Sequence, residues 1–471
     1  MKLDQVLPEP LLQFGRGNES PDIRHGIAEF GPVDLDTPLH KTSVKMGLVG
    51  TLKTITAFND WMLRCAQGIS SEDSNNQNFS PAFPGMNPEK GLGCDFARSP
   101  MWTDVITDDE LKKAMEGPGA IQALAQLFYD RIKACFQLSA VRPDVVLCLP
   151  PESVRKFVKP RLGEELDVDE QDKDDSSIDF HDYLKALCLQ EQCVFQLIWP
   201  RTYQPGEKGV QDEATRAWNL FTGIFYKAGG VPWKLAKPPG ALNTCYVGIS
   251  FARREDGGYM HSSLTQVFND KGEGTILRGG LAKKSEQDRE VHLDEKAALA
   301  LLTDAITNFK KANNQRTPDR VVVHKSSGFD AHELAGFNKA ADVLGVRFKD
   351  FLALNKCKMR WFRKGAYPPL RGTHIILDES TSILYTRGSV PFYRKYPGAY
   401  VPTTIQIRYF QTDRSSSELA AEILALTKLN WNKTQFDSLF PITLEGSRRI
   451  GEIYRWCPNT PDEAVSYALF M

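Results

Sequence analysis

The strongest constraint on the fold is an alternation of short apolar runs and amphipathic stretches in the first half of the chain. The apolar runs at 43–50 and 144–150 predict buried strands, and the stretches 51–66 and 121–136 carry their apolar residues on one stripe, as helices do. Strands and helices alternating in this way predict an α/β fold built on a mostly parallel, doubly wound sheet. Residues 1–42 and 68–104 are rich in Pro, Gly and polar residues, which favours an extended arm and a long irregular loop.

The pattern changes after about residue 240. Runs at 244–252, 260–270 and 274–280 predict three meandering strands, followed by a helix at 294–312, a strand at 319–327, a helix at 331–343 and a strand at 347–354. This is the chain order of an RNase H-like fold. We therefore expect two domains, residues 1–240 and residues 241–471.

Composition narrows the class of protein. The 471 residues carry a net charge of −1, so any nucleic-acid site must be a local basic patch. Eight acids lie between Glu164 and Asp175, which predicts an exposed loop, with partner docking as the alternative. The sequence shows neither an apolar run of roughly 20 residues nor an apolar N-terminus, and its nine cysteines form no C-x-x-C pair. We expect a cytoplasmic protein with reduced thiols.

The stretch from 181 to 227 predicts a helix, a buried strand and a second helix. His181 and Lys185 stand four residues apart and share one helix face. Gln196 lies on the strand, and Lys227 ends the second helix just before two glycines that can stop it. Two lysines, an amide and an imidazole at one point would suit a terminal phosphate. The alternative is two unrelated surface lysines and a histidine at a helix start.

The second domain lacks two acids that RNase H-like nucleases need. Such enzymes hold two metal ions with carboxylates, one from the first strand and one from the end of the strand after the first helix. Here those positions hold Ser250 and Ser326, and a hydroxyl is a poor ligand for Mg²⁺. The sequence therefore predicts an inactive nuclease fold. The alternative is a different strand register in which Asp256, Asp270 or Asp330 supplies the acids.

Motifs along nearly the whole chain resemble those of short prokaryotic Argonautes, which consist of a Rossmann-like MID domain and an RNase H-like PIWI domain. The motifs are FGPVD (30–34), KMGLVGT (45–51), FHDYLKA (180–186), VFQLIW (194–199), FYKAGGVPWKL (225–235), YVGISFA (246–252), VVVHKSSGF (321–329) and LNWNKTQFDSLFPITLEGSRRIGEIYR (429–455). The resemblance makes residues 1–240 an N-terminal arm plus MID domain and residues 241–471 an inactive PIWI domain.

The resemblance also implies a binding site. His181, Lys185, Gln196 and Lys227 would hold the 5′-phosphate and first nucleotide of a guide strand. The family often completes this pocket with a divalent cation, which implies Mg²⁺ bound by the terminal carboxylate of Met471. Many relatives have a tyrosine at the position of His181, so phosphate contact is expected more than stacking on the first base.

The function implied is that of a sensor without cleavage. The guide is expected to be RNA and the target single-stranded DNA, with a DNA guide as the alternative, and the two serines match the catalytically silent short branch. The protein would form a heterodimer with an APAZ-containing effector, such as a sirtuin-like or TIR NADase or a nuclease, in antiviral defence. The alternatives are a guide-dependent endonuclease with an unrecognised metal site and a guide-free scaffold for a partner protein.

Basic residues among aromatics favour a channel for the nucleic-acid backbone. One cluster surrounds Trp361 and Phe362, a second lies among Phe392, Tyr393 and Tyr396, and a pair lies in the last motif, facing the phosphate site. Ordinary solvated surfaces are the alternative. The channel residues expected are Lys356, Lys358, Arg360, Arg363, Lys364, Arg394, Lys395, Arg448 and Arg449, with Arg371 and Arg387 beside them.

Overall fold

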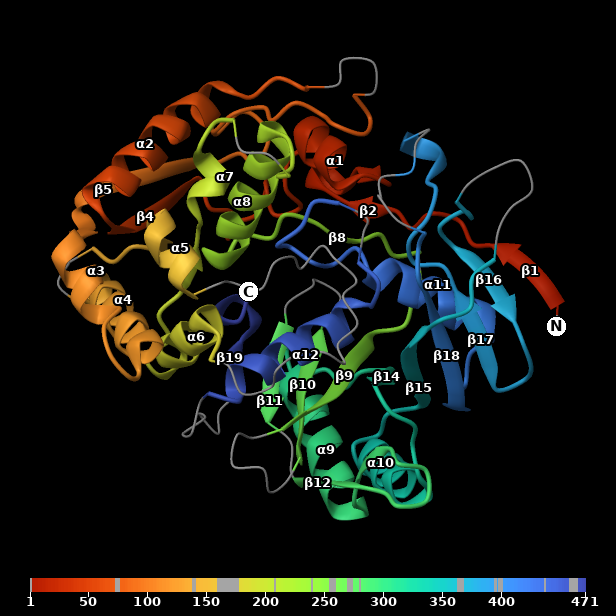
Figure 1. Ribbon diagram of the computed structural model, residues 1–471. Coiled ribbons are helices and arrows are strands. Elements are labelled where there is room, and N and C mark those ends of the chain that lie inside the picture. The colour runs from red at the N-terminus through yellow and green to blue at the C-terminus, as the bar shows by residue number, and fades with distance from the viewer. Residues whose placement is uncertain are drawn as a thin grey trace.

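The computed structural model describes residues 2–72, 77–137, 141–158, 178–206, 209–238, 240–253, 260–268, 274–278, 281–361, 368–393, 396, 401–435, 438–456 and 465–471. They form an N-terminal lobe around a four-stranded sheet and a C-terminal lobe around a twelve-stranded sheet (Figure 1). The mixed α/β architecture agrees with the expected fold class. None of the described helices combines the length and apolar character that a membrane crossing needs.

The sheet of the N-terminal lobe is entirely parallel, as predicted. Its order is β5 (Asp95–Val105), β4 (Ser43–Gly50), β6 (Val145–Leu149) and β7 (Phe195–Leu197). Alternate residues of β6 enter two different hydrophobic cores, because successive side chains of a strand point to opposite faces. Helices α2 (Leu52–Gln67) and α8 (Glu213–Lys227) supply one core. The opposite core is supplied mainly by α3 (Asp108–Ala114), α4 (Ala120–Gln137) and α6 (Phe180–Gln190).

Strand β5 replaces part of the loop predicted for residues 68–104. Two features interrupt the alternating pattern of a strand here. Pro100 lies within β5, and the pairing of β5 with β4 shifts register between Met46 and Leu48. Both are tolerated because β5 is an edge strand, whose outer side has no ladder hydrogen bonds to lose.

The N-terminal arm joins both lobes. Strand β1 (Lys2–Val6) pairs with β16 (Thr373–Ile376) of the C-terminal sheet, whereas β2 (Leu12–Gln13) pairs with β3 (Glu19–Ser20) and β8 (Lys234–Leu235). Helix α1 (Ile23–Phe30) then leads into the first lobe. The boundary expected near residue 240 separates the two large sheets, but the arm crosses it.

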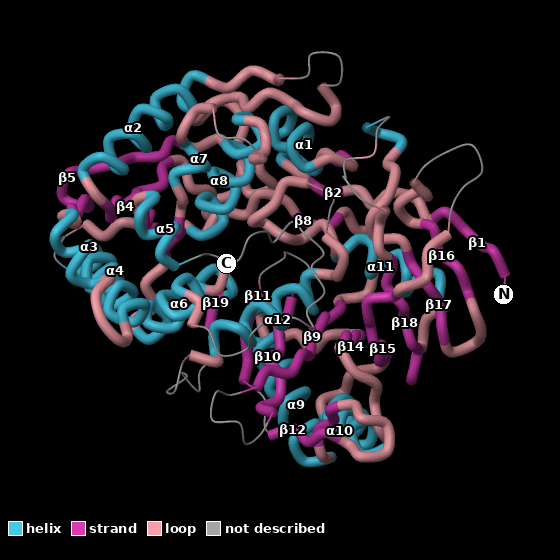
Figure 2. Tube along the Cα trace, in the orientation of Figure 1, coloured by secondary structure: helices cyan, strands magenta, loops and turns pink. Residues whose placement is uncertain are grey.

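The C-terminal sheet begins with the three antiparallel strands that the sequence predicts, β9 (Thr244–Arg253), β10 (Met260–Phe268) and β11 (Gly274–Arg278). Strands β14 (Arg320–Lys325) and β15 (Phe348–Cys357) follow in parallel with β9. The remaining strands are β12 (Leu281–Lys284), β13 (Val291–Leu293), β17 (Thr381–Leu384), β18 (Thr404–Gln411) and β19 (Val465–Ser466). The tube in Figure 2 shows these strands fanning across the C-terminal lobe.

Helices cover both faces of this sheet as well. Helices α9 (Glu295–Ala312) and α10 (Ala331–Val343) pack on one face, and α11 (Ser416–Leu426) packs on the other. Helix α12 (Ile442–Tyr454) crosses β9 at Gly248, where an added Cβ would lie 1.9 Å from the carbonyl oxygen of Thr443. Only glycine permits that approach, which holds α12 between the lobes.

The chain ends between the two lobes, beside α6, whereas its N-terminus lies at the far edge of the C-terminal sheet (Figure 1). Tyr467, Leu469, Phe470 and Met471 are buried in the same hydrophobic core as α8. The last residues of the C-terminal lobe are therefore packed into the N-terminal lobe.

Candidate functional site

Two buried lysines lie where α6 and α8 meet β7. Lys185 is on α6, and Lys227 is the last residue of α8. Helix α8 ends there because Gly229 adopts a φ of 96° and the N–H of Gly230 donates to the carbonyl of Phe225 at 3.0 Å. This is a Schellman ending, and it confirms the glycine stop predicted from the sequence.

The ammonium groups of both lysines share one acceptor, the carbonyl oxygen of Phe195, at 3.1 Å from Lys185 Nζ and 3.3 Å from Lys227 Nζ. Lys185 also donates to the carbonyl of Leu469 at 3.4 Å. Lys227 also donates to Gln196 Oε1, and to the main-chain oxygen of Met471 at 2.8 Å. The structure thus brings together Lys185, Gln196, Lys227 and the chain end, as the sequence indicated.

Both lysines are buried rather than on the surface, with 1% and 4% of their area exposed. Burial lowers the pKa of Lys185 to about 7, although nearby thiols and Asp182 favour the charged form. The Lys185 ammonium also lies 4.2 Å from the centre of the Phe195 ring. The carbonyl oxygens of Phe195 and Leu469 and the amide oxygen of Gln196 carry no formal charge, so an anion placed beside these ammonium groups would be strongly stabilised.

His181 lies on the same helix but makes a different set of contacts. Its Nδ1 accepts a hydrogen bond from Arg449 of α12 at 2.6 Å, and Arg449 forms an ion pair with Asp182 at 2.7 Å. Asp182 is only 1% exposed. Arg449 therefore faces the first lobe, as expected, whereas the Arg448 guanidinium lies 4.0 Å from the centre of the Phe440 ring. Sequence reasoning missed Asp182, although it follows His181 directly.

The serines of the C-terminal lobe occupy the same end of the sheet. Ile249 is in register with Lys325, and the N–H of Ser326 donates to the Ile249 carbonyl at 3.2 Å. Ser250 and Ser326 thus follow two paired residues on neighbouring parallel strands. Asp256 and Asp270 lie outside the described residues, and Asp330 caps α10 by accepting from the N–H of Glu333 at 2.8 Å.

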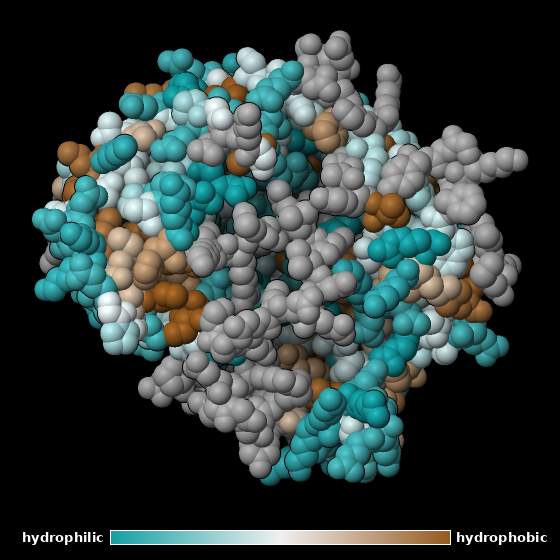
Figure 3. Space-filling view, viewed as in Figure 1, coloured by the Kyte–Doolittle hydropathy of each residue, from teal (hydrophilic) through white to brown (hydrophobic). Residues whose placement is uncertain are grey.

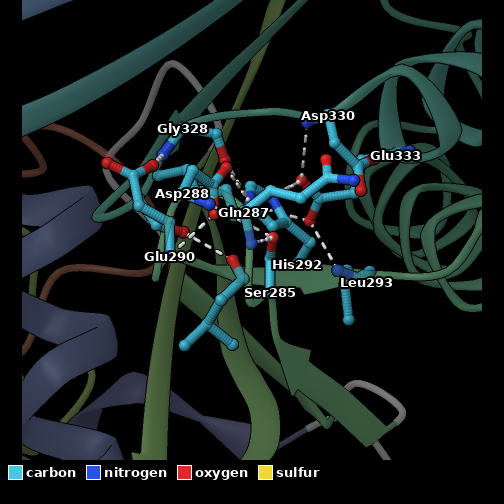
Figure 4. Close-up of polar contacts among 12 residues, drawn as sticks. Ser285, Gln287, Asp288, Glu290, His292, Leu293, Gly328, Asp330 and Glu333 are labelled. Carbon is cyan, nitrogen blue, oxygen red and sulfur yellow. Dashed lines mark hydrogen bonds and ion pairs between the residues drawn. The ribbon is translucent and has the colours of Figure 1, made fainter.

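A cluster of acids and one histidine lies close to this end of the sheet (Figure 4). Asp288, Glu290 and His292 form one group with ligand atoms within 4.8 Å of one another, and His292, Asp330 and Glu333 form a second. Acids and a histidine at this spacing could hold a metal ion. Sequence reasoning missed the cluster, although residues 288, 290 and 292 alternate as residues on one face of a strand do.

The charges of this cluster are already paired within the protein. The buried Lys325 ammonium lies 2.6 and 2.5 Å from the two carboxylate oxygens of Glu333. Glu290 pairs with Arg408 at 2.8 Å, and His292 bridges Asp288 and Glu333 at 2.8 and 3.0 Å. A cation entering the second group would meet the positive charge of Lys325. A third group consists of Asp179, His181 and Asp182. A cation entering it would meet the positive charge of Arg449, which pairs with Asp182.

The predicted channel is only partly described. Lys356, Lys358 and Arg360 are exposed near the end of β15, and Arg360 donates to Thr403 at 3.2 Å. The channel residues that lie outside the described residues are Arg363, Lys364, Arg394 and Lys395.

Two residues near the predicted channel have structural contacts instead. Arg371 is buried and binds Glu9 of the arm at 3.1 Å, together with main-chain oxygens. Tyr393 is buried and donates to Asp22 at 2.5 Å. The expectation that these two lie among solvent-facing channel residues is wrong. On the face shown in Figure 3, the described surface is mostly hydrophilic, with a hydrophobic patch over α4 and α6.

No family model matches the chain, and no curated protein matches it in sequence. Solved structures do. Clostridium butyricum Argonaute bound to a guide DNA and a 19-mer target DNA is 16% identical, with a TM-score of 0.65, over 96% of this chain and 53% of that one. Aa-Ago with externally bound siRNA is 16% identical, with a TM-score of 0.63, and the match covers 99% of this chain and 56% of that one. A. aeolicus Argonaute is 16% identical, with a TM-score of 0.61, and the match covers 98% of this chain and 54% of that one.

This chain therefore has an Argonaute-like fold, and it spans about half the length of the structures that it matches.

Proposed function

We propose that this chain, whose fold is that of the MID and PIWI half of an Argonaute, binds a short guide strand by its 5′-phosphate and uses it to recognise a complementary strand. The observation that carries this proposal is the shared contact of two buried ammonium groups at Phe195. A doubly charged phosphate would replace the neutral oxygens of Phe195, Leu469 and Gln196 as their partners, and its charge would offset the cost of burying the two cations. A solved structure of the same fold, that of Clostridium butyricum Argonaute, holds a guide DNA and a target DNA, which supports the proposal.

A divalent cation would fit this site only together with the phosphate. The oxygens of Met471, Leu469 and Gln196 are of the kind that Mg²⁺ prefers, but the two ammonium groups already donate to them. In the proposed complex, a free carboxylate at Met471 and the phosphate oxygens would hold Mg²⁺. The ion would neutralise charge, while Lys185 and Lys227 hold and orient the phosphate.

We further propose that the chain senses its target without cutting it and passes the signal to an APAZ-containing effector. Serines stand at two positions where metal-binding acids are expected, and the nearby carboxylates already pair with Lys325 and Arg408. In this proposal, contacts to the far end of the guide would come from the partner. The guide would be RNA and the target DNA.

The second candidate is a guide-dependent endonuclease. The group of Asp288, Glu290 and His292 favours it, because ligands of this kind can bind the metal ions of such enzymes. Guide-loaded protein incubated with a labelled complementary strand and Mg²⁺ or Mn²⁺ separates the two. We expect an intact strand. A cut at a fixed distance from the guide's 5′ end that disappears with Glu290→Gln would favour the endonuclease.

The third candidate is a scaffold without a guide. Nucleic acid extracted from the purified protein tests it, because a guide-binding protein should retain short strands that carry a 5′-phosphate. Recovery of such strands supports the proposal, and protein free of nucleic acid would favour the scaffold.

A further inference from the structure

A cavity of about 220 Å³ lies beside the lysine site and shares Gln196 with it. At about 30 Å³ per water molecule, it has room for about seven waters, enough for a sugar ring. Its walls come from both lobes, because α8 and the segment after β7 face Asn432 of the C-terminal lobe. Apolar contact is offered by Leu197, Ile198 and Leu220.

Neutral hydrogen-bonding groups dominate the polar part of the wall. Arg216 is the one charged residue among the lining residues, and its Nη1 already donates to the carbonyls of Arg201 and Thr202. The wall offers one cation where the lysine site offers two, and its amides and hydroxyl suit a hydroxyl ligand, which both donates and accepts. The chemistry of this wall therefore fits a sugar better than a phosphate.

Two of the amides are held in place by a network that joins the lobes. Asn219 Oδ1 accepts from the N–H of Thr434 at 2.9 Å and from its hydroxyl at 2.7 Å. Asn219 Nδ2 donates to Gln211 at 3.1 Å, and Gln211 donates to Gln435 at 2.9 Å. These contacts fix the shape of the cavity before any ligand arrives, which reduces the ordering cost of binding.

Two other polar groups of the wall remain available. Within the described part of the chain, the side-chain amide of Asn432 and the hydroxyl of Thr202 have no hydrogen-bond partner. Gly223 of α8 lies beside that amide, since a Cβ there would be in van der Waals contact with Asn432 Oδ1, at 3.4 Å. The cavity thus presents a free amide and a free hydroxyl beside a preformed wall.

We propose that this cavity binds the ribose of a nucleotide next to the guide's 5′ end and reads its 2′-hydroxyl through Asn432 and Thr202. This inference rests on the proposed function, because it places the guide's 5′-phosphate at the adjoining lysines. The 2′-hydroxyl is the group that distinguishes RNA from DNA at a given site. The protein would therefore select RNA guides by chemistry within this cavity.

Competition binding with four 5′-phosphorylated guides tests the inference: all-RNA, and the same RNA with a single 2′-deoxynucleotide at position 1, 2 or 3. We expect one of the three substitutions to weaken binding to the wild-type protein about three- to tenfold, the effect of one neutral hydrogen bond. Asn432→Ala or Thr202→Val should bind that guide and all-RNA equally. Asn308→Ala, on the exposed side of α9, is the control and should keep the discrimination.

Equal binding of all four guides by the wild-type protein, or full discrimination in both cavity variants, would overturn the inference. A fifth guide, all-RNA with a 5′-hydroxyl, keeps this outcome separate from the proposed function. Weaker binding of that guide with no 2′-hydroxyl effect would reject only the cavity assignment. Binding as tight as that of the phosphorylated guide would reject the phosphate site, and the cavity assignment with it.

Discussion

Lys227 Nζ donates to the main-chain oxygen of Met471 at 2.8 Å, although 244 residues separate them in the sequence. Lys185 reaches the carbonyl of Leu469 in the same way. The last segment of the C-terminal lobe therefore completes a site whose cations belong to the N-terminal lobe. Ligand binding at this site and the fit between the lobes should be coupled, because the same ammonium groups serve both.

The double variant Lys185→Ala, Lys227→Ala should lose guide binding. Each charge-assisted contact to phosphate is worth ~1.5–3 kcal/mol, so the pair should weaken the affinity for a 5′-phosphorylated guide by about two to four orders of magnitude. Fluorescence anisotropy measures this, with circular dichroism to verify the fold. Lys112→Ala, on the exposed surface of α3 in the same lobe, is the matched control and should lose little affinity. Unchanged guide affinity in the double variant would refute the site.

Guide affinity should fall as pH rises through neutrality. Burial lowers the pKa of Lys185 to about 7, so its ammonium form, which binds the anion, is lost above that value. The second ionisation of the phosphate, at about 6, is nearly complete by then and does not mask the effect between pH 7 and 9. Titration calorimetry over this range should show weaker binding to the wild-type protein and a flatter profile for Lys185→Met. Wild-type affinity that stays constant or rises over the same range would be inconsistent with this assignment.

Arg449→Ala should destabilise the contact between the lobes. It leaves the buried carboxylate of Asp182 without its closest cation, and breaking a buried pair in this way costs about 3 kcal/mol. Urea unfolding should show the loss. Arg414→Ala removes an exposed ion pair with Glu418 in the same lobe and should cost at most about 1 kcal/mol. Equal losses in the free energy of unfolding for the two substitutions would mean that the buried pair with Asp182 stabilises the protein no more than an exposed ion pair does.

Glu9→Gln should release the N-terminal arm. Glu9 accepts from Lys428 at 2.7 Å and from Arg371 at 3.1 Å, and the charges of both partners outweigh burial and lower the pKa of Glu9. Gln would leave two buried cations without a counter-charge, a loss of about 3 kcal/mol or more. Hydrogen exchange of β1 and of the segment around Lys428 should then speed up. Exchange as slow as in the wild-type protein would contradict the claim that Glu9 holds the arm in place. Glu19→Gln, exposed on β3, is the control.

Local patterns predicted most of the core elements, because buried strands and amphipathic helices leave a regular apolar period. Helix α2, strand β6 and the elements from β9 to β15 other than β12 and β13 lie within a few residues of the predicted ranges. Strand β5 escaped prediction because Pro100 and a register shift break the pattern at a sheet edge. The pairing of β1 with β16 could not be predicted either, since it depends on contacts between distant segments.

The candidate site was predictable where helix spacing alone positions the side chains, as for Lys185 on α6. That Lys227 and Lys185 share the carbonyl of Phe195 was not predictable, because main-chain acceptors leave no mark in the sequence. The role of Arg371 was also hidden, since a buried and a solvent-facing cation look alike in a basic stretch.

The most direct test of the account compares one RNA guide with a 5′-phosphate and the same guide with a 5′-hydroxyl. The dissociation constant of each is measured with the wild-type protein and with the double lysine variant. We predict that the wild-type protein binds the phosphorylated guide at least about a hundredfold more tightly, and that the variant binds the two guides alike. Equal affinity of the wild-type protein for both guides would contradict the central claim that the buried lysines hold the guide's 5′-phosphate.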